Sequence, residues 1–366
     1  MPELFDPVKV GSLELKNRLM RSATWDGAAD SDGAVTDEAV ALYRELGEGG
    51  VGLVVTGHAF ISPLGQATPL QYGIHTDHMI PGLSRLVEAV HRGGAKITTQ
   101  ITHCGVNSGY LRQQGTPLKV VSFREGAESP QEELTDAEIE AIIDDFASAA
   151  RRAVEAGFDA VQLHGAHAYL MAQFLSPLSN QRTDQWGGSN SKRRRFHLEV
   201  IKRVRQVVGN DFPLMIKFGA HEAREGGLSL EEGVDMAREM AEKGIDGIEI
   251  SVGDARNSIP RLAEDDSEEV LFRDKAAAVK KAVTVPVMLV AGIRSLEMAN
   301  DVLESGDADL ISMCRPLIRE PGLPLRWQQG DLQPAKCISC NKCMPRNGRV
   351  LECGEERRIR EETSSV

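Results

Sequence analysis

EAGFDAVQLH, residues 155–164, carries the pattern that decides the fold. It reads as a helix that ends at a glycine, a tight turn of small or acidic residues, and a short apolar run suited to a buried strand. The same pattern recurs in EGGVGLVVT (48–56), EKGIDGIEIS (242–251) and ESGDADLISM (304–313). We therefore predict that one unit, a helix followed by a buried strand, is used repeatedly along the chain.

Four further apolar runs are strand candidates, at residues 18–24, 96–102, 213–218 and 285–290. Helical patterns separate the candidates, and strictly alternating strands and helices indicate a parallel sheet that is covered on both faces. Eight such units indicate a closed barrel. An open doubly wound sheet stays open as an alternative, although no GxGxxG motif follows the first strand to support it. The predicted fold class is α/β, a single-domain (β/α)8 TIM barrel with a short C-terminal cysteine-containing extension.

The composition excludes several function classes. The 366 residues are 41% hydrophobic and 26% charged, which is typical of a globular protein with a substantial core. The net charge of −12 argues against a nucleic-acid-binding surface, because phosphate contacts require clustered lysine and arginine. No apolar segment approaches the ~20 residues that cross a bilayer, and the first residues do not resemble a signal peptide. We expect no nucleic-acid partner, no membrane association and a cytoplasmic location.

Polar residues gather where the predicted strands end, which is where a barrel of this class places its active site. His164 ends the fourth predicted strand, so His164, His167 and Tyr169 are expected at that face. The other strand ends add further polar side chains, namely Thr24, His58, Gln100, His103, Lys217 and Ser251. The turns AGIR (291–294) and MCRP (313–316) offer backbone amides, a glycine and arginines, and they predict a phosphate-bearing ligand.

Four segments of the chain resemble the old yellow enzyme family of FMN-dependent ene reductases. They are KNRLMRSAT (16–24), QITHCG (100–105), HGAHAYLMAQFLSPLSNQRTDQWGGS (164–189) and CRPLIREP (314–321). The resemblance implies an NADH:flavin oxidoreductase that takes hydride from NADH or NADPH. Its implied substrate is an enone-type small molecule, an α,β-unsaturated carbonyl compound whose C=C bond is reduced. Family members often associate, so a homo-oligomer is compatible with the resemblance.

The resemblance also implies contacts to the flavin ring. Ala23 and Thr24 would lie against the ring, with the Thr24 hydroxyl near flavin O4. Gly57 and Gln100 would border its polar edge, and Lys217 would face N1 and O2. Better-known members carry arginine at the position of Lys217, and lysine keeps the charge but lacks the planar fork that can bond two flavin atoms at once. We therefore expect a flavin potential that differs from theirs.

The remaining implied roles concern the phosphate and the substrate. Gly292 and Arg294 would reach the phosphate or ribityl region, and Cys314 with Arg315 would complete the phosphate site. The resemblance assigns the catalytic roles to the quoted histidine and tyrosine residues: His164 and His167 would grip the substrate oxygen, and Tyr169 would donate the proton. Two imidazole donors can stabilise the enolate that develops on the carbonyl oxygen, and a phenol can act as general acid.

Four cysteines crowd the end of the chain. Cys337, Cys340, Cys343 and Cys353 form a C-x2-C-x2-C-x9-C pattern, which indicates metal binding rather than a disulfide scaffold. The tail resembles that of the 2,4-dienoyl-CoA reductases, which carry a 4Fe–4S cluster there with a somewhat longer spacing. A 4Fe–4S cluster, zinc and free thiols all stay open. We predict an FMN-binding barrel over residues 1–328 and a cysteine-rich tail over 329–366, ending in a charged, frayed segment.

Two other function classes stay open. A metal-dependent barrel hydrolase or lyase could use His164 and His167 as ligands, with Glu222 or Glu249 supplying a carboxylate. Alternatively, a flavin or iron–sulfur electron-transfer subunit could dock with a partner through the cysteine tail.

Some motif residues have structural interpretations. His58 and His103 are as readily satisfied core histidines as catalytic groups. Arg182, Asp184 and the Gly187-Gly188 pair are expected to hold the long loop after the fourth strand in shape.

Overall fold

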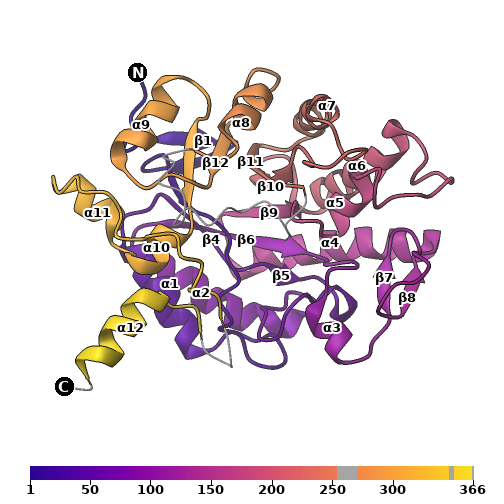
Figure 1. The fold of residues 1–366 in the computed structure, drawn as a ribbon, viewed down its shortest axis with the longest axis horizontal. Helices are drawn as coiled ribbons and strands as arrows, with labels where there is room; N and C mark the ends of the chain where they lie inside the picture. The colour runs from indigo at the N-terminus through magenta and orange to yellow at the C-terminus, as the bar shows by residue number, and fades with distance from the viewer. Residues whose placement is uncertain (254–269, 346–349, 365–366) are drawn as a thin grey trace.

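The computed structural model describes residues 1–253, 270–345 and 350–364, and it shows a closed parallel barrel (Figure 1). Each barrel strand pairs with two neighbours, and the circle closes because β13 pairs with β3 and β4 pairs with β6. The strands in barrel order are β3 (Leu19–Arg21), β4 (Leu53–Val55), β6 (Lys96–Thr102), β9 (Ala160–Gly165), β10 (Leu214–Gly219), β11 (Gly247–Ser251), β12 (Val287–Val290) and β13 (Leu310–Met313). The predicted eight-stranded barrel is therefore confirmed.

The strand register sets five polar residues in two adjacent rows inside the barrel. Lys217 on β10 is the register partner of His164 on β9 and of Glu249 on β11. Gln100 on β6 is the register partner of Gln162 on β9. None of these five side chains belongs to a residue more than 3% exposed. Polar groups this deeply buried require hydrogen-bond partners, and several of these five residues supply partners to one another.

Helices cover the outer face of the barrel (Figure 1). The connecting helices are α1 (Asp37–Glu48), α2 (Ile80–Arg92), α4 (Asp136–Ala156), α6 (Asn190–Val208), α7 (Leu230–Glu242), α8 (Arg273–Lys280) and α9 (Leu296–Glu304). α4 starts with a capping box between Thr135 and Glu138 and ends at Gly157 with φ of 90°, as its sequence signals indicate. Among the described helices, none combines the length and apolarity that a bilayer crossing requires.

Shorter elements fill the loops. The helices are α3 (Gly109–Gln113), α5 (Leu170–Leu175), α10 (Arg315–Arg319) and α11 (Leu323–Gln328), with 3-10 turns η1 (Pro63–Gly65) and η2 (Asp77–Met79). The strands are β5 (Ala59–Phe60), which extends the pairing of β6, and the pair β7 (Leu118–Val120) and β8 (Gln131–Glu133).

An antiparallel hairpin, β1 (Val8–Val10) with β2 (Leu13–Leu15), packs against the apolar part of the barrel interior. Its side chains form one buried cluster with residues from the barrel strands, among them Met20, Leu53, Met215, Met288 and Leu310. The barrel interior is therefore apolar on the hairpin side and polar at the level of Lys217.

The tail packs against the barrel. The Ala335 amide donates to the Arg294 carbonyl at 2.8 Å, and the Leu351 amide donates to the Asp26 carbonyl at 2.7 Å. The expected frayed end is wrong for most of its length, because residues Gly354–Thr363 form helix α12. An ion pair between Arg319 of α10 and Glu356 of α12 joins this helix to the barrel. The helix is the yellow element next to the C-terminus in Figure 1.

Arg182 holds the long loop after β9 in place, as its sequence context predicts. Its guanidinium donates to the carbonyls of Val121 and Leu134 at 3.1 and 2.7 Å and to Asp184 at 2.6 Å. The indole of Trp186, which is fully buried, donates to Asp136 in the first turn of α4. The loop is therefore fixed to α4 and to the segment between β7 and α4.

We expect Arg182→Ala to lower the free energy of unfolding by about 3 kcal/mol, because two buried carbonyls and a carboxylate lose their donor. The midpoint of urea unfolding, followed by tryptophan fluorescence, measures this loss. Arg92→Ala serves as the control, since Arg92 pairs with Glu88 on the surface with side-chain exposures of 78% and 64%. Surface pairs of this kind contribute little, so an equal loss in both variants would contradict the assignment.

Candidate active site

The loop that carries the paired histidines has a strained backbone. His167 and Ala168 have φ angles of 57° and 53°, a left-handed conformation that is uncommon for residues other than glycine. Hydrogen bonds hold this conformation, because the His167 and Ala168 amides donate to the carbonyls of Val252 and Gly253 just after β11. Strain of this kind, fixed by a neighbouring strand end, clusters at functional sites.

His164 and His167 present separate ring nitrogens to the barrel mouth. Their ring centroids lie 5.1 Å apart and their planes are nearly perpendicular, at 78°. His164 Nδ1 accepts from the Ala166 amide at 3.4 Å, so the proton of a neutral ring lies on Nε2. His167 Nε2 lies 2.8 Å from the Ser251 hydroxyl, which leaves Nδ1 for a ligand. Each ring can therefore offer one nitrogen to the same small molecule.

Both imidazoles are neutral at pH 7. Burial lowers the pKa of His167 to about 3, with the nearby charges of Lys217 and His58 as smaller causes. Burial also moves the pKa of His164 well below its usual range, and His167, His58 and Lys217 add to the effect. A neutral imidazole keeps one N–H donor and adds no charge. The pair is thus suited to binding an oxygen that becomes negative during a reaction.

Tyr169 lies beside both His164 and His58. Its ring centroid is 4.7 Å from that of His164, and its hydroxyl is 3.3 Å from His58 Nε2. Burial raises the pKa of Tyr169 above its usual range, so the phenol keeps its proton. Burial lowers the pKa of His58 to about 4. His58, for which sequence left a structural role open, therefore belongs to the site, and its imidazole is neutral there.

His103 has a structural environment instead. Its Nδ1 accepts from the Gly105 amide at 3.1 Å, and its carbonyl accepts from the Leu170 amide at 3.0 Å. Burial lowers its pKa to about 4. These bonds tie the end of β6 to the start of α5, which supports the histidine loop from outside.

Lys217 and Glu249 form a buried ion pair at the centre of the barrel. Lys217 Nζ lies 3.3 Å from Glu249 Oε1 and donates to the Ser22 hydroxyl at 2.7 Å. The Ser22 and Ser312 hydroxyls each donate to Glu249 Oε1 at 2.7 Å. Gln162 Nε2 donates to Glu249 Oε2 at 2.9 Å. Both carboxylate oxygens of Glu249 therefore accept hydrogen bonds, and Lys217 is held by Ser22 and Glu249.

Gln100 belongs to the same network. Its Nε2 donates to Gln162 Oε1 at 2.7 Å, so β6 is connected to Glu249 through β9. The carbonyl oxygen of Gln100 and the second N–H of its amide are left for another partner. Gln100 and Lys217, both predicted flavin contacts, are thus fixed by one set of hydrogen bonds.

The predicted contacts on the first strand also come together with neighbouring residues. The Thr24 hydroxyl lies 2.8 Å from Cys314 Sγ, so two predicted cofactor contacts from opposite ends of the sequence meet. Ala23 packs partly buried against the apolar cluster inside the barrel. The Gly57 amide donates to the Tyr43 hydroxyl at 2.7 Å, which fixes the backbone at that predicted contact.

The turn after β12 has the backbone of an anion-binding loop. Ala291 and Gly292 have φ angles of 81° and 94°. Turns that present successive backbone N–H groups form concavities that suit anions. Arg294 follows directly in the same turn. Arg315, predicted as a phosphate ligand, donates to the Asn341 side chain at 2.7 Å and to the Ser339 carbonyl at 3.4 Å. In this structure its guanidinium is therefore engaged by the tail.

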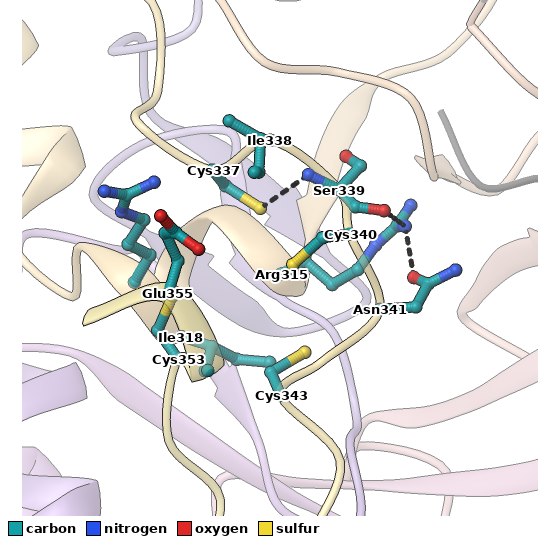
Figure 2. Close-up of a pocket in the computed structure, with 12 residues that line it drawn as sticks. Arg315, Ile318, Cys337, Ile338, Ser339, Cys340, Asn341, Cys343, Cys353 and Glu355 are labelled. Carbon is teal, nitrogen blue, oxygen red and sulfur yellow. Dashed lines mark hydrogen bonds between the residues drawn. The ribbon is translucent and has the colours of Figure 1, made fainter. Parts of the chain in front are cut away.

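The tail cysteines surround one pocket (Figure 2). Cys337, Cys340, Cys343 and Cys353 line it together with Arg315. Across the described ranges 1–253, 270–345 and 350–364, no three histidine, cysteine, aspartate or glutamate side chains are arranged to hold a single metal ion. Neither the four thiols nor His164 and His167 with a carboxylate form such a group among the described residues.

Sequence reasoning missed the partners of Lys217. Ser22, Gln162 and Ser312 were not singled out, and Glu249 was considered only as a metal ligand. Gln162, Glu249 and Ser312 each interrupt an apolar strand run, as in AVQLH, GIEIS and LISM. A polar residue inside a run that is otherwise buried on all sides is the signal that could have found them.

Comparison with known proteins places these features in a family. Residues 3–333 match the NADH:flavin oxidoreductase / NADH oxidase family. A relative named NADH oxidase, from Thermoanaerobacter brockii, is 38% identical over 364 residues, covering 96% of this chain and 54% of its own length. The chain thus spans about half the length of that relative.

Solved structures agree. A 2-naphthoyl-CoA reductase complex has a TM-score of 0.86 and 30% identity, covering 93% of this chain and 54% of that one. An old yellow enzyme homologue from Zymomonas mobilis has a TM-score of 0.76 and 25% identity, and the match covers 94% of this chain and 98% of that one. The resemblance inferred from the sequence is confirmed, and the chain belongs to the NADH:flavin oxidoreductase / NADH oxidase family.

Proposed function

We propose that the chain binds FMN, takes hydride from NADH or NADPH, and reduces the C=C bond of an α,β-unsaturated carbonyl compound. The observation that carries the proposal is the pair of neutral imidazoles next to a protonated phenol at the mouth of a barrel that holds a buried lysine. Family membership supports the flavin and the nicotinamide. A 2-naphthoyl-CoA reductase is among the similar solved structures, which is consistent with a reductive reaction.

The residues present fit FMN. The pyrimidine edge of a flavin carries both hydrogen-bond donors and acceptors. Gln100 and Lys217 supply an amide and a cation from β6 and β10, the two strands that flank β9. The left-handed turn at Ala291 and Gly292 suits a phosphate. Thr24 supplies a hydroxyl beside Cys314. Ring, ribityl chain and phosphate would thus all meet polar groups of this chain.

When bound, FMN would take hydride from the nicotinamide and pass it to the substrate β-carbon. The chain makes that carbon a better acceptor. His164 and His167 would donate to the carbonyl oxygen, and one such donor is worth ~3 kcal/mol of transition-state stabilisation in other enzymes. Tyr169 holds the proton that the α-carbon needs, since burial keeps its phenol neutral.

The cysteine tail supports a second proposal. We infer that residues 1–328 form the flavin-binding unit and that residues 329–366 form a tail whose Cys337, Cys340, Cys343 and Cys353 take up a 4Fe–4S cluster. The four thiols line one pocket. The C-x2-C-x2-C spacing of Cys337, Cys340 and Cys343 is one that iron–sulfur clusters use.

Anaerobic half-reactions test the proposed function. Protein purified with added FMN should show flavin absorbance, bleach with NADH or NADPH, and recover its colour with cyclohexenone. Tyr169→Phe should slow the recovery by about 100-fold and leave the bleaching unchanged, because only the second step needs the phenolic proton. Absence of flavin after FMN supplementation contradicts cofactor binding. If oxygen restores the flavin colour but no enone does, alkene reduction is contradicted.

Phenol binding tests the histidine pair. His164→Ala and His167→Ala should each weaken the charge-transfer complex of a phenol anion with FMN by about 10–100-fold, while the surface variant His91→Ala should not. A lowered histidine pKa means that the neutral ring persists on acidification. Affinity should therefore show no histidine ionisation between about pH 5 and pH 8. A transition near pH 6.5 that disappears in His167→Asn would show a charged pair instead.

Metal analysis tests the tail. Anaerobically purified protein should contain about four iron and four sulfide per chain. Cys340→Ser and Cys343→Ser should lower both, while the flavin content and the enone-dependent recovery stay unchanged. One zinc per chain, or no metal after reconstitution with iron and sulfide, contradicts the cluster and leaves the flavin proposal untouched.

A further inference from the structure

We propose that Glu249 is the residue that sets the reduction potential of the flavin site, by holding Lys217 and offsetting its positive charge. The proposal rests on the proposed function, because it needs FMN beside Lys217. Glu249 is not a predicted contact of FMN or of the substrate. It acts through Lys217, so it is a positioning residue. No part of the proposed hydride and proton transfer uses it directly.

The contacts of Glu249 show that its carboxylate is the centre of the polar layer. It is fully buried, and it receives hydrogen bonds from three strands besides its ion pair with Lys217. Ser22 comes with β3, Gln162 from β9 and Ser312 from β13. A buried carboxylate with this many partners is stable in its charged form, whereas one that lacked them would be costly.

The carboxylate also dictates the orientation of the neighbouring side chains. A carboxylate can only accept, so Gln162 must present its amide nitrogen to Glu249 and its carbonyl to Gln100. Gln100 must then use one N–H on Gln162, which leaves its carbonyl oxygen for a ligand. Ser22 follows the same rule, because it donates to Glu249 and accepts from Lys217. Glu249 thereby determines which polar atoms two predicted flavin contacts can offer.

The electrostatic consequence has a definite sign. A lone buried ammonium beside a flavin would favour the anionic reduced form strongly. With Glu249 3.3 Å away, Lys217 acts on the flavin as one end of an ion pair rather than as a free cation. Removal of the carboxylate charge should therefore stabilise the reduced flavin and raise its potential. Removal of the lysine charge alone should lower it.

Glu249→Gln tests this directly, since glutamine keeps the volume of the side chain and most of its hydrogen-bonding capacity. We expect the equilibrium constant for FMN reduction to increase about tenfold, which is ~30 mV for a two-electron couple. The potential is measured anaerobically against a reference dye at about pH 6 and about pH 8. The rise should appear at both pH values.

Ser312→Ala is the matched control. It removes one hydrogen bond to the same carboxylate oxygen but keeps both charges. If Glu249 acted only by maintaining structure, the two variants would shift the potential alike. We expect the shift in Ser312→Ala to be well below that in Glu249→Gln.

Paired variants keep the proposal testable if Glu249→Gln does not fold. Lys217→Met lowers the potential, and Lys217→Met/Glu249→Gln, which leaves no buried charge unpaired, should return it toward the wild-type value. Equal potentials in these two variants overturn the inference. Wild-type protein that binds no FMN overturns the proposed function and the inference together, whereas FMN-loaded variants that bleach normally at an unchanged potential overturn only the inference.

Discussion

A lysine ammonium can stay charged inside this barrel only because a carboxylate lies beside it. Taking either ion alone out of water costs several kcal/mol, and one excellent pair with satisfied hydrogen bonds offsets most of this cost. Lys217 and Glu249 meet because β10 and β11 pair in a register that sets them side by side. The register depends in turn on closure of the whole barrel. The site is therefore a consequence of the fold rather than an addition to its surface.

Lys217 also affects the pKa values of three histidines of the candidate site. Its charge is one of the causes that lower the pKa values of His58, His164 and His167, although burial is the largest cause for each. With FMN bound as proposed, this one cation would favour the reduced flavin while it helps burial to lower the pKa values of the imidazoles. The strained turn at His167 and Ala168 depends on β11 as well, because the backbone after that strand accepts from both residues. Strand β11 therefore fixes both the charge layer and the histidine loop.

Sequence could predict the barrel because its signals are local and repeated. Each unit ends a helix at a glycine and then begins a buried run, and the structure has a strand at all eight predicted places. His164, His167 and Tyr169 could be found because they end such a run within a specific motif. The partners of Glu249 could not be predicted from sequence. They come from β9, β10, β13 and the residue after β3, and only the strand register brings them together. The bonds of Arg315 to the tail depend on long-range packing in the same way.

The most direct test of the account is a crystal structure of the protein with FMN and a phenol bound. The account predicts an isoalloxazine ring across the barrel mouth, with Lys217 Nζ at its N1 and O2 edge and the Gln100 amide on the pyrimidine side. The phenol oxygen should lie between His164 and His167. A flavin bound elsewhere, or a phenol oxygen held by other groups while the two imidazoles point away, would contradict it.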